Sequence, residues 1–159
     1  MKIKPLKQPN SSTCGPACIK MVAHFLGLTI SMKRAIRLSG YKAQEGTSNE
    51  DIMSALKKLG LRVREKKNVA WGELRRSNKP SNAIIVSWML NGTIGHVSVA
   101  EKVTATRIHL ADSVKGKVIK LPKVDFMRLW IDYEPHWYPR KNTDIQLRWM
   151  AVVSKKSKT

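Results

Sequence analysis

The sequence contains very little cysteine: Cys14 and Cys18 are its only two in 159 residues. They lie four positions apart in a segment with a helical pattern, where the geometry of a disulfide is met poorly. A disulfide framework is therefore excluded as the source of stability. The chain also lacks an apolar run close to the roughly 20 residues of a membrane helix, and its start, MKIKPLKQPN, lacks the apolar stretch of a secretory signal. We therefore expect a cytoplasmic protein.

Acidic residues are also scarce, with 11 Asp and Glu against 30 Lys and Arg, for a formal net charge of +19. Such a surface attracts nucleic acids, anionic membranes and acidic peptides alike, so charge alone does not name a partner. Against nucleic acid, the sequence has no recognised motif, and its basic residues are not interleaved with aromatic ones. Metal-ligand spacing, a phosphate loop and a dinucleotide fingerprint are absent as well, so we expect no metal and no cofactor.

The pattern of apolar residues places most helices before most strands. A chain of this length can bury a core as one domain. Helical patterns cover 14–27, 31–38, 50–59, 71–76 and 124–130, and strand patterns cover 61–64, 83–88, 96–103, 106–112, 117–121 and 147–153. This order predicts an α+β fold in which N-terminal helices pack against a C-terminal antiparallel sheet.

Cys14 lies at the predicted start of the first helix, after the N-cap residues Ser11, Ser12 and Thr13. Unpaired N–H groups and the positive end of the helix dipole favour a thiolate there, which is the reactive form of cysteine. The alternative is that Cys14 is an inert, small apolar residue. A thioredoxin-like site is not favoured, because three residues and not two separate Cys14 from Cys18.

Four histidines could serve as a base for this thiol, and we single out His96, which begins a predicted strand. In an antiparallel hairpin, a three-residue loop at 103–105 places His96 opposite Asp112, with both side chains on one face. A loop of even length puts them on opposite faces unless a bulge corrects the register. Asp112 can then orient the imidazole ring, as the third member of a catalytic triad does. Taken singly, His96 is better explained as a satisfied strand-end histidine and Asp112 as a turn residue before Ser113, whereas together with Cys14 these readings are weaker. The other histidines are His24, expected to be structural or exposed, His109 in mid-strand, and His136 in the aromatic stretch EPHWYP.

The region around Cys14 resembles the opening of the C39 peptidases, papain-like domains that cleave leader peptides from bacteriocin precursors. That family has a Gln six residues before the Cys, a Met near the middle of the helix and a Gly at its end; Gln8, Met21 and Gly27 match. Further blocks follow in the family's order: EGTSNEDIMSALKKLGL at 45–61, GHVSVAEKV at 95–103, HLADSVKGKVIKL at 109–121 and DFMRLW at 125–130.

The resemblance implies a cysteine peptidase acting after a Gly-Gly or similar small-residue pair. It implies that Cys14 attacks the carbonyl, His96 is its base and Asp112 orients His96. Gln8 and the backbone N–H of Cys14 would form the oxyanion hole, a type of contact that typically contributes a few kcal/mol. One departure stands out, because Ser113 follows Asp112 where the family usually has Pro.

The resemblance also implies a single C39-like domain over 1–153, followed by a basic flexible tail at 154–159. Because the chain shows no transmembrane or nucleotide-binding segment, we expect a free-standing domain rather than a whole exporter. The expected partners are a peptide or protein substrate, acidic in view of the charge, and a membrane transporter; the oligomeric state stays open. Two alternatives remain: a catalytically silent peptide-binding module on the same fold, and a basic nucleic-acid-binding protein.

Overall fold

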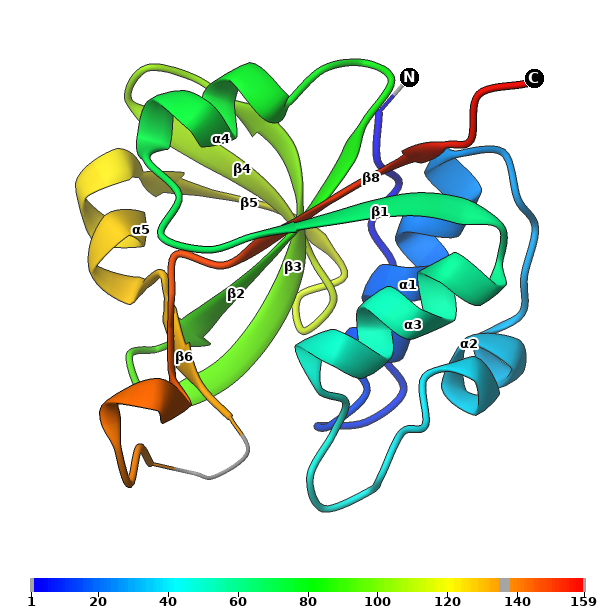
Figure 1. Ribbon diagram of the computed structural model, residues 1–159, viewed down its shortest axis with the longest axis horizontal. Coiled ribbons are helices and arrows are strands. Elements are labelled where there is room, and N and C mark those ends of the chain that lie inside the picture. Colours follow the sequence, from blue (N-terminus) through cyan, green and yellow to red (C-terminus); the bar gives the residue numbers. More distant parts are fainter. Residues whose placement is uncertain (1, 135–137, 159) are drawn as a thin grey trace.

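The computed structural model describes residues 2–134 and 138–158 and arranges them as a six-stranded antiparallel sheet with helices on both faces (Figure 1). The helices are α1 (Cys14–Phe25), α2 (Met32–Leu38), α3 (Asn49–Lys58), α4 (Trp71–Ser77), α5 (Lys123–Leu129) and the short 3₁₀ helix η1 (Asn142–Asp144). The strands are β1 (Leu61–Lys66), β2 (Ala83–Leu90), β3 (Ile94–Val103), β4 (Arg107–Asp112), β5 (Lys117–Pro122), β6 (Ile131–Tyr133), β7 (Ile145–Leu147) and β8 (Met150–Lys155).

The first three predicted helices form, and α2 and α3 have a capping serine, whereas the side chain of Thr13 does not cap α1. The Ser31 side chain accepts a hydrogen bond from the Arg34 N–H at 3.1 Å and so caps α2, while Ser48 caps α3 by accepting from the Asp51 N–H at 3.0 Å. Gly27 follows α1 with a φ of 84°, in the left-handed region that favours glycine at a helix end. These predicted helices are therefore confirmed.

The large sheet has the strand order β1-β8-β2-β3-β4-β5, and each pair of neighbours is antiparallel. Its central strand β2 is buried on both faces, because Ile85 packs in the core beneath α1 and α3 while Ile84 and Trp88 pack in the core beneath α4 and α5. Figure 1 shows α1, α2 and α3 on one side of the sheet and α4 and α5 on the other. The predicted α+β architecture is confirmed, with helices on the second face as an addition.

The C-terminal part of the chain departs from the predicted strand at 147–153. The chain turns at Arg148, which has a φ of 47°, so one expected strand becomes two, β7 and β8. Strand β7 pairs with β6 in a separate two-stranded sheet. Sequence patterns missed β6 because its three residues are too few to show a period.

The end of the last strand also lies further along the chain than expected. Ser154 and Lys155, assigned above to a flexible tail, belong to β8 and pair with Arg62 and Leu61 of β1. Backbone pairing with an edge strand thus orders them, and the described residues beyond β8 are 156–158. Within the part of the chain that the structure describes, no helix is both long enough and apolar enough to cross a bilayer.

Candidate active site

Cys14 is the first residue of α1 and is half-buried, with Cys18 fully buried one turn further. The N-cap residue Thr13 makes no side-chain capping hydrogen bond to α1, so the helix dipole faces the thiol without a capping oxygen from that residue. Cys18 donates a hydrogen bond from Sγ to the Val97 carbonyl at 3.4 Å, which braces α1 against β3. Helix α1 therefore holds Cys14 next to the strand that carries His96.

Gly15 lets a loop approach the start of α1. A Cβ at this position would lie 2.7 Å from the Cβ of Thr47, closer than real Cβ atoms come. The loop before α3 therefore packs against the helix turn that carries Cys14 only because residue 15 has no side chain. This contact gives a physical reason for two sequence blocks of the C39 pattern, one around Cys14 and one around Thr47.

His96 and Asp112 form a buried, short hydrogen bond. The distance from His96 Nε2 to Asp112 Oδ2 is 2.6 Å, and the two residues are 4% and 0% exposed. Because Nε2 is engaged by Asp112, the second ring nitrogen of His96 is the one available to Cys14. Proximity of the Cys14 side chain is one of the contributions that raise the pKa of His96. Structure thus brings together all three residues singled out from the sequence.

The register between β3 and β4 shows how His96 and Asp112 come to share a face. Val103 pairs with Ile108, which leaves a loop of even length, and on that basis the two side chains would diverge. A bulge between Ala100 and Lys102 then shifts the register by one residue. Beyond it, Val99 pairs with Ala111, so Asp112 lies level with Ser98 and diagonal to His96. The predicted directly opposed pair is therefore wrong, while the bulge route to a shared face is confirmed.

The Asp112 carboxylate accepts three hydrogen bonds, and both of its oxygens have a donor. Besides His96, it accepts at Oδ2 from the Ser98 hydroxyl at 3.1 Å and at Oδ1 from the Lys115 backbone N–H at 2.9 Å. Ser98 in turn accepts from the indole N–H of Trp88 at 3.1 Å. The Trp88 ring also packs edge-on against His96, with 5.7 Å between ring centroids. These contacts fix both the carboxylate and the imidazole ring.

Burial and hydrogen bonding compete in setting the charges of this pair. Burial lowers the pKa of His96, but the hydrogen bond to Asp112, the proximity of Cys14 and the negative charge of Asp112 raise it from 6.5 to about 9. Burial raises the pKa of Asp112, but the hydrogen bonds from His96, the Lys115 N–H and Ser98 hold it below its ordinary value of 3.8. At neutral pH the site therefore holds an imidazolium facing a carboxylate.

Gln8 is tied to the turn that follows Asp112. Its backbone N–H donates to the Ser113 carbonyl at 2.9 Å, and its side-chain Oε1 accepts from the Ser113 hydroxyl at 2.7 Å. Its Nε2 donates to the Asn10 carbonyl at 2.6 Å, which uses one of the two amide protons. Ser113, fully buried where the C39 pattern usually has Pro, thus fixes which end of the Gln8 amide is the donor.

The remaining thiol and imidazoles lie outside this arrangement. Burial, together with the negative charges of Cys14 and Asp112, raises the pKa of Cys18 well above its ordinary value, which keeps it a thiol. His24 is exposed and its Nε2 lies 3.2 Å from the Ile30 carbonyl, while His109 is half-buried on β4. His136 lies outside the described residues.

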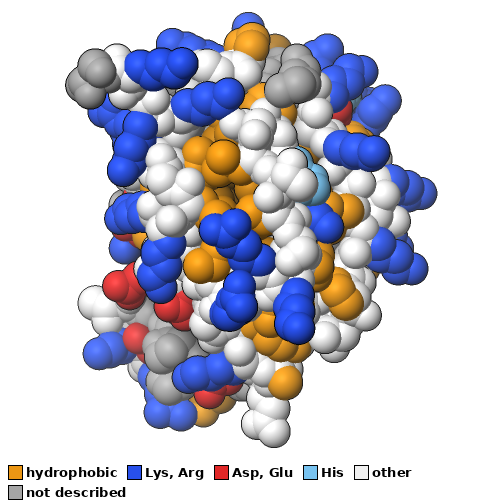
Figure 2. Space-filling model, turned by 90° about the vertical axis from the view of Figure 1, so that its right-hand side faces the viewer, with side chains coloured by type: hydrophobic (Ala, Val, Ile, Leu, Met, Phe, Trp, Pro, Cys, Tyr) orange, Lys and Arg blue, Asp and Glu red, His pale blue; other side chains and the backbone are white. Residues whose placement is uncertain are grey.

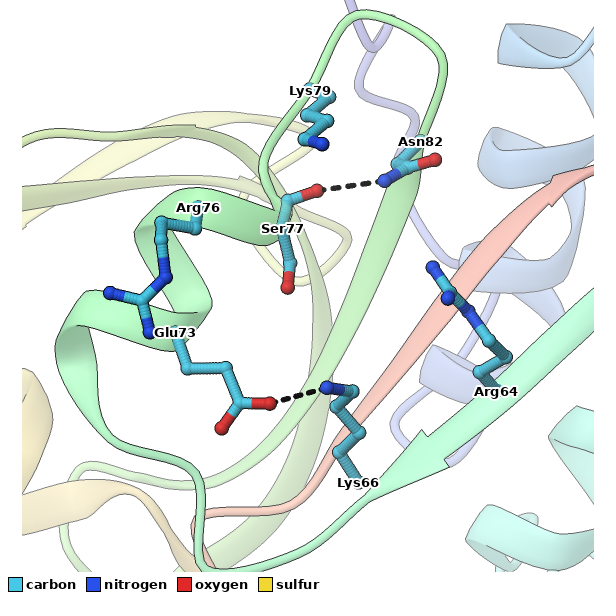
Figure 3. A pocket seen from close by; sticks show the side chains of 7 residues that line it. All are labelled: Arg64, Lys66, Glu73, Arg76, Ser77, Lys79 and Asn82. Atoms are coloured by element: carbon cyan, nitrogen blue, oxygen red, sulfur yellow. Dashed lines mark hydrogen bonds and ion pairs between the residues drawn. The ribbon is translucent and has the colours of Figure 1, made fainter.

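A separate basic hollow of about 330 Å³ lies beside α4 and the edge strand β1 (Figure 3). Arg64 and Lys66 line it from β1, Arg76 from α4 and Lys79 from the loop after α4, and Lys66 pairs with Glu73 of α4. Cys14, His96 and Asp112 do not line it, and neither does any aromatic residue. The hollow therefore lacks the stacking platform that a single-strand nucleic-acid site needs.

The surface over the α1–α3 side of the sheet is mixed rather than uniformly basic. Figure 2 shows Lys and Arg side chains around a band of exposed apolar side chains, with a small cluster of Asp and Glu side chains at one edge. Such a surface suits a partner with both apolar and acidic groups.

Comparisons with known proteins agree on one family. The peptidase C39 family matches residues 2–134. Lactococcin-G-processing and transport ATP-binding protein LagD of Lactococcus lactis subsp. lactis is 32% identical over 129 residues, which are 80% of this chain and 18% of LagD. SPbeta prophage-derived sublancin-168-processing and transport ATP-binding protein SunT of Bacillus subtilis (strain 168) is 28% identical over 123 residues, 76% of this chain and 17% of SunT. The matched segments thus cover less than a fifth of the length of either relative.

Solved structures share the fold over nearly the whole chain. The peptidase domain of Streptococcus ComA, a bifunctional ABC transporter, superposes with a TM-score of 0.73 at 24% identity and covers 97% of this chain and 99% of that domain. A double glycine motif protease from an AMS/PCAT transporter, in complex with its leader peptide, gives a TM-score of 0.72 at 16% identity over 97% and 94% of the two chains. These likenesses establish the papain-like fold.

Proposed function

Because this chain belongs to the peptidase C39 family, we propose that it is a cysteine peptidase that hydrolyses a peptide bond after a small-residue pair such as Gly-Gly. The observation that carries the proposal is the buried His96–Asp112 hydrogen bond beside Cys14 at the start of α1. A thiol, an imidazole and a buried carboxylate in this order are the parts of a nucleophile, a base and its orienting group.

In the first half of the reaction, the proton of Cys14 resides on His96 and the thiolate attacks the carbonyl carbon. A C–S bond forms and the carbonyl π pair moves to oxygen. When this intermediate collapses, the C–N bond breaks and the departing amine takes the proton from His96. Asp112 keeps the imidazolium oriented throughout, since its Oδ2 accepts from Nε2 at 2.6 Å.

In the second half, His96 removes a proton from water as the oxygen attacks the thioester carbon. The C–S bond then breaks, releasing the acid product and returning the thiol. The oxyanion in both halves would accept from the backbone N–H of Cys14 and from the free amide proton of Gln8. Support for Gln8 comes from its hydrogen bond with the Ser113 hydroxyl, which engages the amide oxygen. The amide nitrogen, which donates one proton to the Asn10 carbonyl, is then left as the donor.

The substrate class follows from the relatives and from charge. LagD and SunT are processing and transport proteins, and the AMS/PCAT protease was solved with a leader peptide. We therefore propose a leader or precursor peptide as substrate and a membrane transporter as the partner that handles the product. The net charge of +19 favours an acidic peptide, which attractive steering would help to capture.

The proposal is tested by a matched pair of cysteine variants. Cleavage of a peptide with Gly-Gly before the scissile bond is followed by mass spectrometry for the wild type, Cys14→Ala and Cys18→Ala. The wild type and Cys18→Ala should yield both products, and Cys14→Ala should yield neither. Undiminished cleavage by Cys14→Ala would remove this residue from the mechanism.

The same experiment separates the enzyme from a silent peptide-binding module. A silent module would bind the peptide with equal affinity in the wild type and in Cys14→Ala, and neither would turn it over. Binding to Cys14→Ala together with turnover by the wild type supports the peptidase.

A further inference from the structure

The basic hollow beside α4 and β1 has no part in the steps above, and its charges are unbalanced. It has a volume of about 330 Å³ and is lined by one carboxylate, that of Glu73, and by four basic side chains, those of Arg64, Lys66, Arg76 and Lys79. Lys66 already pairs with Glu73. Among the residues that the structure describes, Arg64, Arg76 and Lys79 have no acidic partner within ion-pair distance. Three cations therefore share one concave site without a counter-charge.

One wall of the hollow is the edge strand β1, and it faces away from the candidate active site. Arg64 and Lys66 lie two residues apart in β1, so their side chains project from the same face of the strand. Val63, the neighbour of Arg64, packs against the core beneath α1 and α3, so Arg64 projects to the opposite side of the sheet, where α4 lies (Figure 1). An occupant of the hollow therefore leaves the α1 side of the sheet, which carries Cys14, free for a peptide.

The other walls are α4 and the loop that follows it. A Cβ on residue 72 would lie 3.2 Å from Arg76 Nη1, so Gly72 leaves room for this guanidinium beside the helix. At the end of α4, the Ser77 carbonyl accepts from the Lys79 backbone N–H at 2.9 Å and from Asn82 Nδ2 at 3.0 Å. These bonds fold the loop so that Lys79 and Asn82 line the hollow (Figure 3), and they occupy a carbonyl at the negative end of the helix.

The lining of the hollow limits the chemistry of an occupant. All 7 lining residues are polar or charged. Apolar small molecules need apolar walls, and nucleobases need stacking partners, so neither suits this site. Guanidinium groups bind phosphate oxygens through paired hydrogen bonds, and ammonium groups bind them as point charges. The lining therefore suits a compact ligand that carries several negative charges close together.

From this arrangement we propose that the basic hollow binds a small polyanion with two linked phosphate groups, that is, a diphosphate. Arg64, Arg76 and Lys79 supply the positive charge, and the Ser77 hydroxyl and the Asn82 amide are uncharged polar groups of the same lining. An extended acidic peptide fits less well, because it places carboxylates on one side about 7 Å apart and needs a strip of cations rather than one hollow. The site does not depend on peptidase activity.

Titration calorimetry with inorganic pyrophosphate, in a buffer free of divalent metal, tests the proposal. The wild type should bind one equivalent, and Arg64→Gln should weaken the affinity about five- to tenfold, because one charge-assisted contact is lost. The matched control is Arg62→Gln, since Arg62 lies on the same face of β1, is exposed like Arg64 and does not line the hollow. It lowers the net charge equally, but the affinity should fall less than about twofold.

A second variant changes the affinity in the opposite direction. Glu73→Gln removes the one carboxylate of the lining and frees Lys66, so it should tighten the binding of pyrophosphate about two- to fivefold. Loss of structure does not produce a gain in affinity, so this variant keeps the test decisive even if Arg64→Gln folds poorly.

Three nucleotide probes show whether the phosphate groups alone are recognised. ADP should bind within about threefold of pyrophosphate, because the hollow offers no stacking surface to the base. AMP, with one phosphate group, should bind at least about tenfold more weakly than ADP, and adenosine should give no heat of binding. Binding of ADP without binding of pyrophosphate would contradict recognition of the diphosphate.

The proposal fails if the wild type shows no saturable binding of pyrophosphate. Equal losses in Arg64→Gln and Arg62→Gln would overturn it as well, because the net charge and not the hollow would then attract the anion. Binding confined to vesicles of anionic phospholipid, or to an acidic peptide, would have the same consequence. None of these measurements involves peptide cleavage, so their outcome is separate from that of the peptidase proposal.

Discussion

Two pairs of opposite charge illustrate how differently the same chemistry behaves in two regions of this protein. The His96–Asp112 side chains, next to Cys14, are 3% and 0% exposed, whereas the Lys66–Glu73 side chains at the basic hollow are 38% and 35% exposed. Both pairs join a cation to a carboxylate by direct hydrogen bonding. Water screens the second pair and hardly reaches the first, so we expect only the first to carry large energetic and functional effects.

Burial alone does not account for the difference expected between the two pairs, because their surrounding hydrogen bonds differ as well. Asp112 receives further hydrogen bonds from Ser98 and from the Lys115 N–H, which offset its desolvation. Glu73 has no second partner among the described residues. A satisfied network makes the His96–Asp112 pair rigid as well as charged, as a catalytic base requires.

The largest effect is expected from the carboxylate-to-amide change in the buried pair. Asp112→Asn removes the charge that stabilises the imidazolium and should lower kcat/KM for a Gly-Gly peptide by about 10²–10⁴. It should also lower the free energy of unfolding by about 3 kcal/mol, the low end for a broken buried pair. Peptide cleavage and urea denaturation measure the two effects. A loss below tenfold in kcat/KM would show that Asp112 does not orient the base.

The second effect is a pH dependence of stability that only the buried pair should show. The pKa of His96 is raised from 6.5 to about 9, so the folded state binds its proton more tightly than the unfolded state does. The resulting stability is fully present below about pH 6.5 and is lost as pH rises through about 9, and it amounts to about 3 kcal/mol. Asp112, whose pKa is lowered, contributes stability that is lost as pH falls below its ordinary value.

Urea denaturation of the wild type and Asp112→Asn between pH 5 and 10 provides the measurement. The difference in stability between them should be nearly constant from pH 5 to 6 and should shrink toward pH 10. A difference that grows with pH would reverse the sign of the argument and contradict the assigned coupling.

A smaller effect is expected at Ser113, which connects Asp112 to Gln8. Ser113→Ala removes the hydroxyl that donates a hydrogen bond to the Gln8 amide oxygen at 2.7 Å. If Gln8 donates to the oxyanion, kcat should fall about three- to tenfold with KM little changed, because the contact matters in the transition state. Ser113→Thr retains the hydroxyl and should restore most of the rate. Equal losses in both variants would point to packing at this buried position instead.

The smallest effect is expected at the exposed pair. Glu73→Gln should change the free energy of unfolding by less than about 1 kcal/mol and leave peptide cleavage unchanged. High salt should reduce even that small difference, since the pair is reached by solvent. An effect on stability comparable to that of Asp112→Asn would remove the distinction between the two pairs.

Sequence reasoning could single out Cys14, His96 and Asp112 as candidates because each has a local marker: a helix start, a strand start and a strand end. It could not place the bulge between Ala100 and Lys102, because bulges depend on the pairing of two strands rather than on either alone. Ser98 could have been found, since it lies two residues from His96 and alternation puts both on one face.

The packing of Asp132 of β6 against Gly95 of β3 was not predictable in the same way. Asp132 lies on a strand of three residues that shows no period, and its proximity to Gly95 arises from chain segments far apart in the sequence. The role of Ser113 was equally hidden, because the sequence shows only that it replaces a Pro and not that its hydroxyl reaches back to Gln8.

Labelling with a Gly-Gly peptide that ends in a vinyl sulfone tests the central claim most directly, since it asks whether Cys14 is a nucleophile activated by the His96–Asp112 pair. Intact mass and peptide mapping should show one equivalent bound at Cys14, none at the fully buried Cys18, and labelling at least tenfold slower in Asp112→Asn. Labelling at Cys18, or equal rates at Cys14 in the wild type and Asp112→Asn, would contradict the account.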